Sequence, residues 1–188
     1  MHISPFYRLF SLFLSVCFLL SAATTTFAKE TSPYGIHILN PSELDAALPL
    51  IRPVESETWT YVTVPLPLSD LKKESEWQEF FKKAKEKKVI PIVRLMTKFK
   101  DGAWAVPTKK EVVDSFAFLK ALDWPYEKKY VIAYNEVNHA KEWGGRIDPE
   151  SYADTLMFTA NWAHSEDFGF QILPAAMDLA APNGSATR

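Results

Sequence analysis

The chain has 188 residues, of which 47% are apolar and 23% charged, a composition typical of a globular protein rather than of a disordered chain or a fibre. Its 21 Lys and Arg are balanced by 23 Asp and Glu, and the net charge of -2 argues against a nucleic-acid partner, which needs a basic surface. With four His and one Cys, we expect neither a zinc ribbon nor an iron–sulfur centre, and we predict no metal or cofactor.

Residues 1–28 have the pattern of a secretory signal peptide. Arg8 supplies a positive start, Leu9–Ala23 is uncharged and apolar, and Thr26-Phe27-Ala28 offers a cleavage site. The apolar run is shorter than the ~20 residues of a membrane-spanning helix, so an uncleaved anchor is the less favoured alternative. We therefore predict a secreted, extracellular or periplasmic protein without stable membrane insertion. Cleavage would remove Cys17, so a buried core and not disulfides must stabilise the mature chain.

Residues 29–188 are expected to form one domain in which strands and helices alternate. Five short apolar runs predict strands: Tyr34–Leu39, Trp59–Val64, Val89–Leu95, Tyr130–Tyr134 and Phe170–Ala175. Four helix starts lie between them: Asn40-Pro41 with a helix to about Ile51, capping boxes at Ser75/Gln78 and Thr108/Glu111, and Asp148-Pro149. One helix between successive strands predicts βαβ units and a parallel sheet. The two architectures that fit are a doubly wound sheet and part of a (β/α)8 barrel.

In a parallel α/β fold, polar residues just after the strands form the candidate site. Neither of the glycine-rich phosphate-binding motifs is present, which disfavours dinucleotide and P-loop proteins. The remaining candidates follow predicted strands: Asn40, Arg94 to Thr97, Asn135 to His139, and Asp178.

The most informative cluster surrounds Glu136, directly after the fourth predicted strand. A carboxylic acid in a partly apolar cleft has a raised pKa and can donate a proton to a leaving oxygen. Asn135 beside it can present its amide to a sugar hydroxyl. The structural alternative is that Glu136 pairs with Arg94 or Lys141 at the rim of the sheet.

The sequence Tyr134-Asn135-Glu136-Val137-Asn138, followed by Trp143-Gly144-Gly145 and Asp148 to Ala153, resembles the fourth strand of clan A glycoside hydrolases. The resemblance covers roughly residues 34–178. These retaining (β/α)8-barrel enzymes include cellulase-like and xylosidase-like families. The resemblance implies that Glu136 is the general acid/base, that Asn135 contacts the sugar, and that the chain acts on a poly- or oligosaccharide.

The chain also departs from that clan. No Arg occurs in Trp59–Val64, where the clan carries one, although Arg94 on the next strand could cover part of its role. The clan's nucleophile is a Glu at the end of strand seven, beyond the five strands predicted here. Asp178 is not expected to replace it. We therefore interpret the chain as the N-terminal half of a barrel, a fragment that is catalytically incomplete.

Further substrate contacts are expected at the same edge of the sheet. Trp104 and Trp143 lie in loops after predicted strands three and four, where an indole could stack on a sugar ring; alternatively, both fold back over the rim. Arg94, Asn138 and His37 complete the predicted substrate-binding set, although His37 fits a core histidine equally well.

Two alternatives to the hydrolase remain open. One is a secreted, non-catalytic carbohydrate-binding module, and the other is an exported structural or interaction protein with a doubly wound sheet. A half barrel would leave strands one and five unpaired at its edges, so we also expect self-association of the chain through them.

Overall fold

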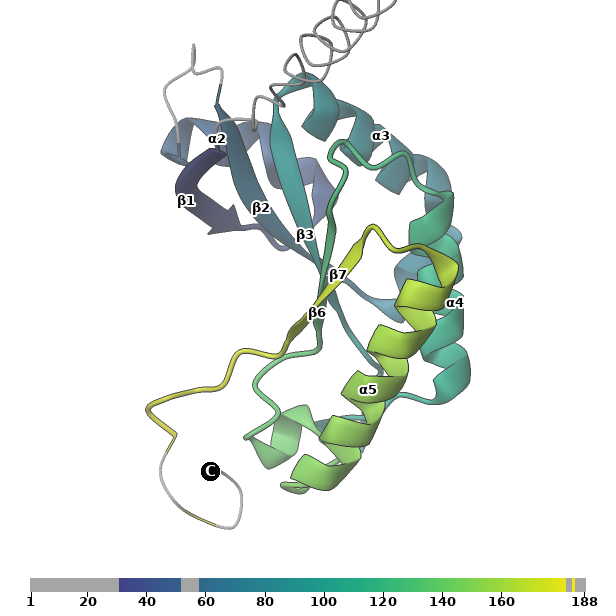
Figure 1. Cartoon of the computed structure of the whole chain (residues 1–188). Coiled ribbons are helices and arrows are strands. Elements are labelled where there is room, and N and C mark those ends of the chain that lie inside the picture. Colours follow the sequence, from purple (N-terminus) through teal and green to yellow (C-terminus); the bar gives the residue numbers. More distant parts are fainter. Residues whose placement is uncertain (1–30, 52–57, 182–183, 185–188) are drawn as a thin grey trace, which may run out of the picture. The chain divides into compact units, whose positions relative to one another are not determined.

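The predicted alternation of strands and helices is present in the computed structural model, which describes residues 31–51, 58–181 and 184 (Figure 1). The main sheet consists of β1 (Thr31–His37), β2 (Trp59–Leu66), β3 (Val89–Leu95), β6 (Lys129–Ala133) and β7 (Phe170–Pro174). Its connections contain the helices α2 (Leu44–Ile51), α3 (Glu74–Glu86), α4 (Lys109–Ala121) and α5 (Pro149–Glu166). The shorter elements are the 3-10 helices η1 (Pro41–Glu43), η2 (Leu68–Lys72) and η3 (Ala140–Glu142), and the strands β4 (Phe99–Lys100) and β5 (Ala103–Trp104). The predicted signal peptide, residues 1–28, lies outside the described residues.

All five strands of the main sheet are parallel, and their order is β1-β2-β3-β6-β7. The predicted parallel α/β fold is therefore confirmed. A doubly wound sheet reverses its strand order partway across, whereas the described strands follow one another in chain order. Because crossovers between parallel strands are right-handed, a sheet that grows in one direction carries its helices on one face. None of the helices in the described ranges is long and apolar enough to cross a membrane.

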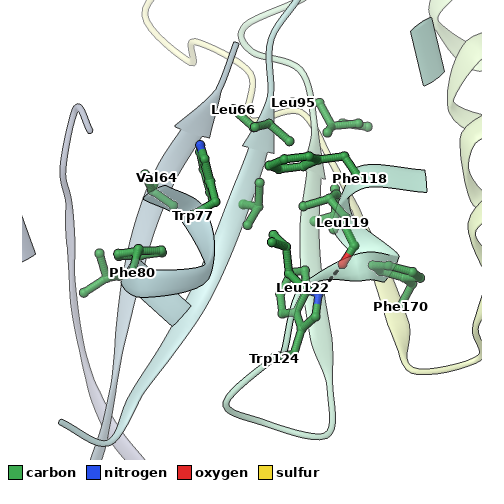
Figure 2. Packing of buried hydrophobic residues seen from close by; sticks show 14 of the residues in the cluster. Val64, Leu66, Trp77, Phe80, Leu95, Phe118, Leu119, Leu122, Trp124 and Phe170 are labelled. Carbon is green, nitrogen blue, oxygen red and sulfur yellow. Dashed lines mark hydrogen bonds between the residues drawn. The ribbon is translucent and has the colours of Figure 1, made fainter. Parts of the chain in front are cut away.

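The helix-covered face of the sheet holds the apolar core. Val64, Val93 and Val131 lie side by side in the register of β2, β3 and β6, and all three are fully buried. Figure 2 shows this packing, in which Trp77 of α3 and Leu119 of α4 lie against the strands. Full burial of an aliphatic side chain contributes roughly 1.5–3 kcal/mol. This face is therefore the main source of stability.

The opposite face, which we call the open face, carries three register pairs: Tyr61 with Ile90, Ile92 with Tyr130, and Ile132 with Leu173. The rings of Tyr61 and Tyr130 meet edge to face at 6.4 Å. Ile90 is fully buried, the other four residues on β2, β3 and β6 are only half-buried, and Leu173 is 36% exposed. Parallel sheets ordinarily have both faces covered. The open face is therefore partly uncovered, whereas the same face of most parallel sheets is buried.

The end of the second strand differs from the prediction for an identifiable reason. The second strand was predicted to end at Val64, yet β2 continues through Pro65 to Leu66. The pairing of β1 with β2 ends at Thr63, so the missing N–H of Pro65 falls where β2 has no neighbour on that side. The strand continues because β3 still pairs with it, from Thr60 to Leu66.

The predicted capping box at Ser75 and Gln78 is wrong. Helix α3 begins after Lys73 without any side-chain cap, because the chain enters it from η2 and the Lys73 carbonyl accepts the Trp77 amide. By contrast, the capping box of Thr108 and Glu111 is present at the start of α4. The N-cap backbone is extended at Thr108, whereas at Lys73 it is not.

Candidate functional site

A cavity of about 170 Å³ opens at the carboxyl ends of β3 and β6. Arg94 is the penultimate residue of β3, and Asn135 follows β6 after Tyr134. Across the two strands, Arg94 Nη1 donates a 2.6 Å hydrogen bond to Asn135 Oδ1. Both residues line the cavity. The structure thus brings together two of the polar residues that the sequence placed at this edge.

Sequence reasoning missed a further polar residue of the cavity wall, Glu142. It is the last residue of η3, and its Oε2 accepts a 3.3 Å hydrogen bond from Asn135 Nδ2. The Asn135 amide therefore links a guanidinium to a carboxylate, and we call this group the Arg94–Asn135–Glu142 cluster. The only sequence signal for Glu142 was its position in the loop after the fourth predicted strand.

Burial dominates the electrostatics of Arg94. It lowers the pKa of the guanidinium, while the negative charges of Glu142 and then Glu136 act in the opposite direction. Arginine nevertheless stays charged at any physiological pH. Its Nε is buried and has no hydrogen-bond partner among the described residues. The site therefore holds a permanent, partly desolvated positive charge close to two carboxylates.

Glu136, the predicted acid/base, is half-buried and close enough to Arg94 for their charges to interact. It does not line the cavity. Its backbone φ is 33°, and that of Tyr134 is 75°, so two non-glycine residues of this loop adopt left-handed conformations. Such conformations cost about 1–3 kcal/mol each and cluster at functional sites. The loop after β6 thus stores strain beside the cavity.

Two aromatic residues line the cavity, Tyr134 and Trp104. Trp104 belongs to the short hairpin β4–β5, which the sequence did not predict. Trp104 is half-buried, and its ring meets that of Phe99 at 5.4 Å. Its carbonyl accepts a 2.7 Å hydrogen bond from the Gly144 amide, which joins the hairpin to the loop after β6. Trp104 is therefore positioned where a ligand ring could pack on it.

Trp143 has a different place, and its expected role in sugar stacking is wrong for the described structure. Only 1% of its surface is exposed. It packs between the rings of Tyr134 at 5.4 Å and Tyr152 at 5.3 Å. Its Nε1 is buried and finds no hydrogen-bond partner within the part of the chain that the structure describes. Trp143 is a packing residue because the turn after η3 folds it inward, the structural alternative given by the sequence.

Asn138, a predicted substrate contact, makes hydrogen bonds to the backbone of Asp178. Its Nδ2 donates to the Asp178 carbonyl at 2.9 Å, and its Oδ1 accepts from the Asp178 amide at 3.1 Å. His139 Nε2 lies 2.9 Å from a carboxylate oxygen of Asp178. Hydrogen bonds from the Ala180 amide and from His139 lower the pKa of Asp178. This group fastens the segment after β7 to the loop after β6, and it lies outside the cavity lining.

His37 ends β1 and is exposed at the same edge of the sheet. Partial desolvation and the charge of Arg94 both lower its pKa below the ordinary value of 6.5. Both effects favour the neutral form of the imidazole.

The described residues contain no group of three or more His, Cys, Asp or Glu placed to hold a metal ion. No protein-family model matches the chain, and a search of curated proteins finds no match either.

Proposed function

We propose that residues 29–188 are the first five βα units of a (β/α)8 barrel from a retaining glycoside hydrolase. Glu136 is the general acid/base and Asn135 a sugar contact, as the resemblance to clan A implies. Residues 1–28 direct export. The substrate is an oligo- or polysaccharide, and the second carboxylate comes from the later part of the barrel.

The strand order supports the barrel part of this proposal. Five parallel strands in chain order are what a barrel segment requires, whereas a doubly wound sheet needs a reversal. In a complete barrel, the half-exposed residues of the open face would be core residues, since that face is the filled interior.

The observation that carries the proposed site is the 2.6 Å hydrogen bond between Arg94 and Asn135, in the wall of a cavity at the carboxyl ends of the strands. Active sites of such barrels lie at this end. Trp104 adds an aromatic surface, and the strained loop brings Glu136 next to Arg94. An aromatic ring beside convergent polar groups suits a sugar, which has apolar ring faces and hydroxyl edges.

In this proposal Glu136 acts twice. It first gives a proton to the glycosidic oxygen while a second carboxylate, ~5–5.5 Å away, attacks the anomeric carbon and the bond to the leaving sugar breaks. Glu136, now a carboxylate, then takes a proton from the water that hydrolyses the glycosyl-enzyme. The proton returns to Glu136, so the cycle closes.

The test uses the chain joined to the later part of its barrel, with aryl glycosides as substrates. Glu136→Gln should slow the cleavage of a poor leaving group by about 10²–10⁴-fold. It should affect the bond-breaking step of an activated dinitrophenyl glycoside much less, because that leaving group needs no proton. Glu79→Gln on the exposed surface of α3 is the matched control and should have no effect. Undiminished hydrolysis in Glu136→Gln would remove Glu136 from the mechanism.

A second candidate, a carbohydrate-binding module without catalysis, is favoured by one specific observation. Trp104, Asn135 and Glu142 line the cavity, whereas Glu136 does not. Sugar affinity without turnover, lost in Trp104→Ala and kept in Glu136→Gln, would support this candidate over the hydrolase.

A further inference from the structure

The loop that carries Glu136 is attached to both neighbouring strands of β6. On one side of Glu136, Asn135 accepts the 2.6 Å hydrogen bond from Arg94 of β3. On the other side, Asn138 bonds to Asp178 in the segment after β7. Since β3 and β7 are the strands that pair with β6, the loop is attached in both directions across the sheet. Glu136 lies between the two attachment points.

The attachment to the segment after β7 is a double hydrogen bond. Asn138 Nδ2 donates to the Asp178 carbonyl at 2.9 Å, and Asn138 Oδ1 accepts from the Asp178 amide at 3.1 Å. A side-chain amide that pairs with both backbone groups of one residue fixes the distance and the orientation of that backbone. His139 Nε2 adds a contact of 2.9 Å to a carboxylate oxygen of Asp178. We call the pair of bonds between the two residues the Asn138–Asp178 clasp.

The backbone between the two attachments has a conformation that needs support. Glu136 has a φ of 33°, a region that residues with a side chain disfavour. Such a residue persists where the surrounding structure holds it there. Its carbonyl accepts a 2.8 Å hydrogen bond from the His139 amide, which closes a turn. The clasp is made by Asn138, within that turn, and therefore holds the turn closed. Relaxation of Glu136 to a negative φ would displace its carboxyl group relative to Arg94.

We propose that Asn138 is a positioning residue for Glu136 and that Asp178 is its anchor. The clasp holds the loop in the left-handed conformation that keeps the Glu136 carboxyl group beside Arg94. The inference rests on the proposed function, in which Glu136 is the acid/base. Neither residue of the clasp lines the cavity. They therefore act on the reaction through Glu136 and not through contact with the sugar.

Hydrogen exchange of the His139 amide in the full chain, observed by NMR, measures how firmly the loop is held. Asn138→Ala removes both bonds of the clasp and should accelerate this exchange by about tenfold or more. Asp178→Ala keeps the backbone groups that Asn138 binds and should have a smaller effect, roughly threefold. Asn161→Ala, the same substitution on the exposed surface of α5, is the matched control and should leave the exchange unchanged.

Rescue by glycine separates positioning of Glu136 from a general gain in stability. Glycine adopts a positive φ without steric cost. Glu136→Gly combined with Asn138→Ala should therefore recover most of the lost protection of the His139 amide. An exchange rate that Asn138→Ala leaves unchanged, or that Glu136→Gly fails to restore, would overturn the inference.

The hydrolysis assay of the proposed function gives the catalytic readout. Asn138→Ala should lower kcat for a poor leaving group by roughly 10- to 100-fold, the effect of a displaced acid. It should leave KM within about twofold, because the cavity lining is intact. If Glu136→Gln slowed hydrolysis and Asn138→Ala did not, the inference would be overturned and the proposed function would stand. Full-rate hydrolysis by both variants would overturn the proposed function together with the inference.

Discussion

The two faces of the sheet are made by the same five strands and have opposite characters. On the helix-covered face, Val64 and Val93 are fully buried in a core that includes large side chains of α3 and α4. Figure 2 shows Val64 together with Trp77 of α3 and Phe118 of α4 in this core. On the open face, Ile92 and Tyr130 stay half-buried although they lie on the same strands. Side chains alternate between the two faces along each strand. The residues that stabilise the fold therefore lie on one face, and the partly accessible residues, which could pack against further structure, lie on the other.

The largest effect on stability is expected from a comparison of two tryptophans, the buried Trp143 and the half-buried Trp104. Trp143→Ala should lower the free energy of unfolding by about 3 kcal/mol or more, because it leaves a cavity between Tyr134 and Tyr152. Trp104→Ala should lower it much less and should instead weaken sugar binding. Urea unfolding and a sugar titration measure the two effects. If the two variants lost equal stability, Trp104 would be a core residue.

A pair of leucines tests the two faces directly. Leu119 on α4 is fully buried, whereas Leu173 on β7 is 36% exposed. Leu119→Ala should cost about 2–5 kcal/mol in urea unfolding, the range for buried leucines. Leu173→Ala should cost no more than ~1 kcal/mol, since it removes little apolar area from a protein interior. A loss at Leu173 as large as that at Leu119 would mean that the open face is covered.

Features with a local sequence signal were predictable, whereas features that depend on the fold were not. Strand Val89–Leu95 was predicted with the bounds that the structure gives, because its apolar run is a local signal. The Thr108–Glu111 capping box was local as well. Whether Trp143 points into the core or toward a ligand depends on the turn after η3, and no local pattern encodes that choice. Glu142 was missed for the same reason, because only the fold brings it to Asn135.

The open face and the strand edges predict a moderate effect on assembly. Edges at β1 and β7 and the half-exposed residues between them should make the chain self-associate as its concentration rises. Leu173→Lys places a charge on this surface and should shift the equilibrium toward monomer. Size-exclusion chromatography with light scattering measures it. A stable monomer of the unmodified chain at high concentration would contradict both the open edges and the half-barrel proposal.

The smallest predicted effect lies at the amino ends of β6 and β7, where Lys129 Nζ is 2.6 Å from Asp167 Oδ2 and the Gly169 amide donates to Oδ1 at 2.7 Å. These bonds, the one from Lys129 first, lower the pKa of the Asp167 carboxyl below its usual 3.8. Asp167 therefore adds stability above about pH 4–5 that is lost as the pH falls through its lowered pKa.

Asp167→Asn should reduce the free energy of unfolding by less than ~1 kcal/mol at pH 7, as for other partly exposed pairs, and the difference from the parent chain should vanish in acid. Lys129→Gln should remove most of the same pH-dependent part, because Lys129 is the first cause of the lowered pKa. Urea unfolding between pH 2 and pH 7 measures both variants. A difference that persisted unchanged at pH 2 would show that Asp167 acts through packing and not through its charge.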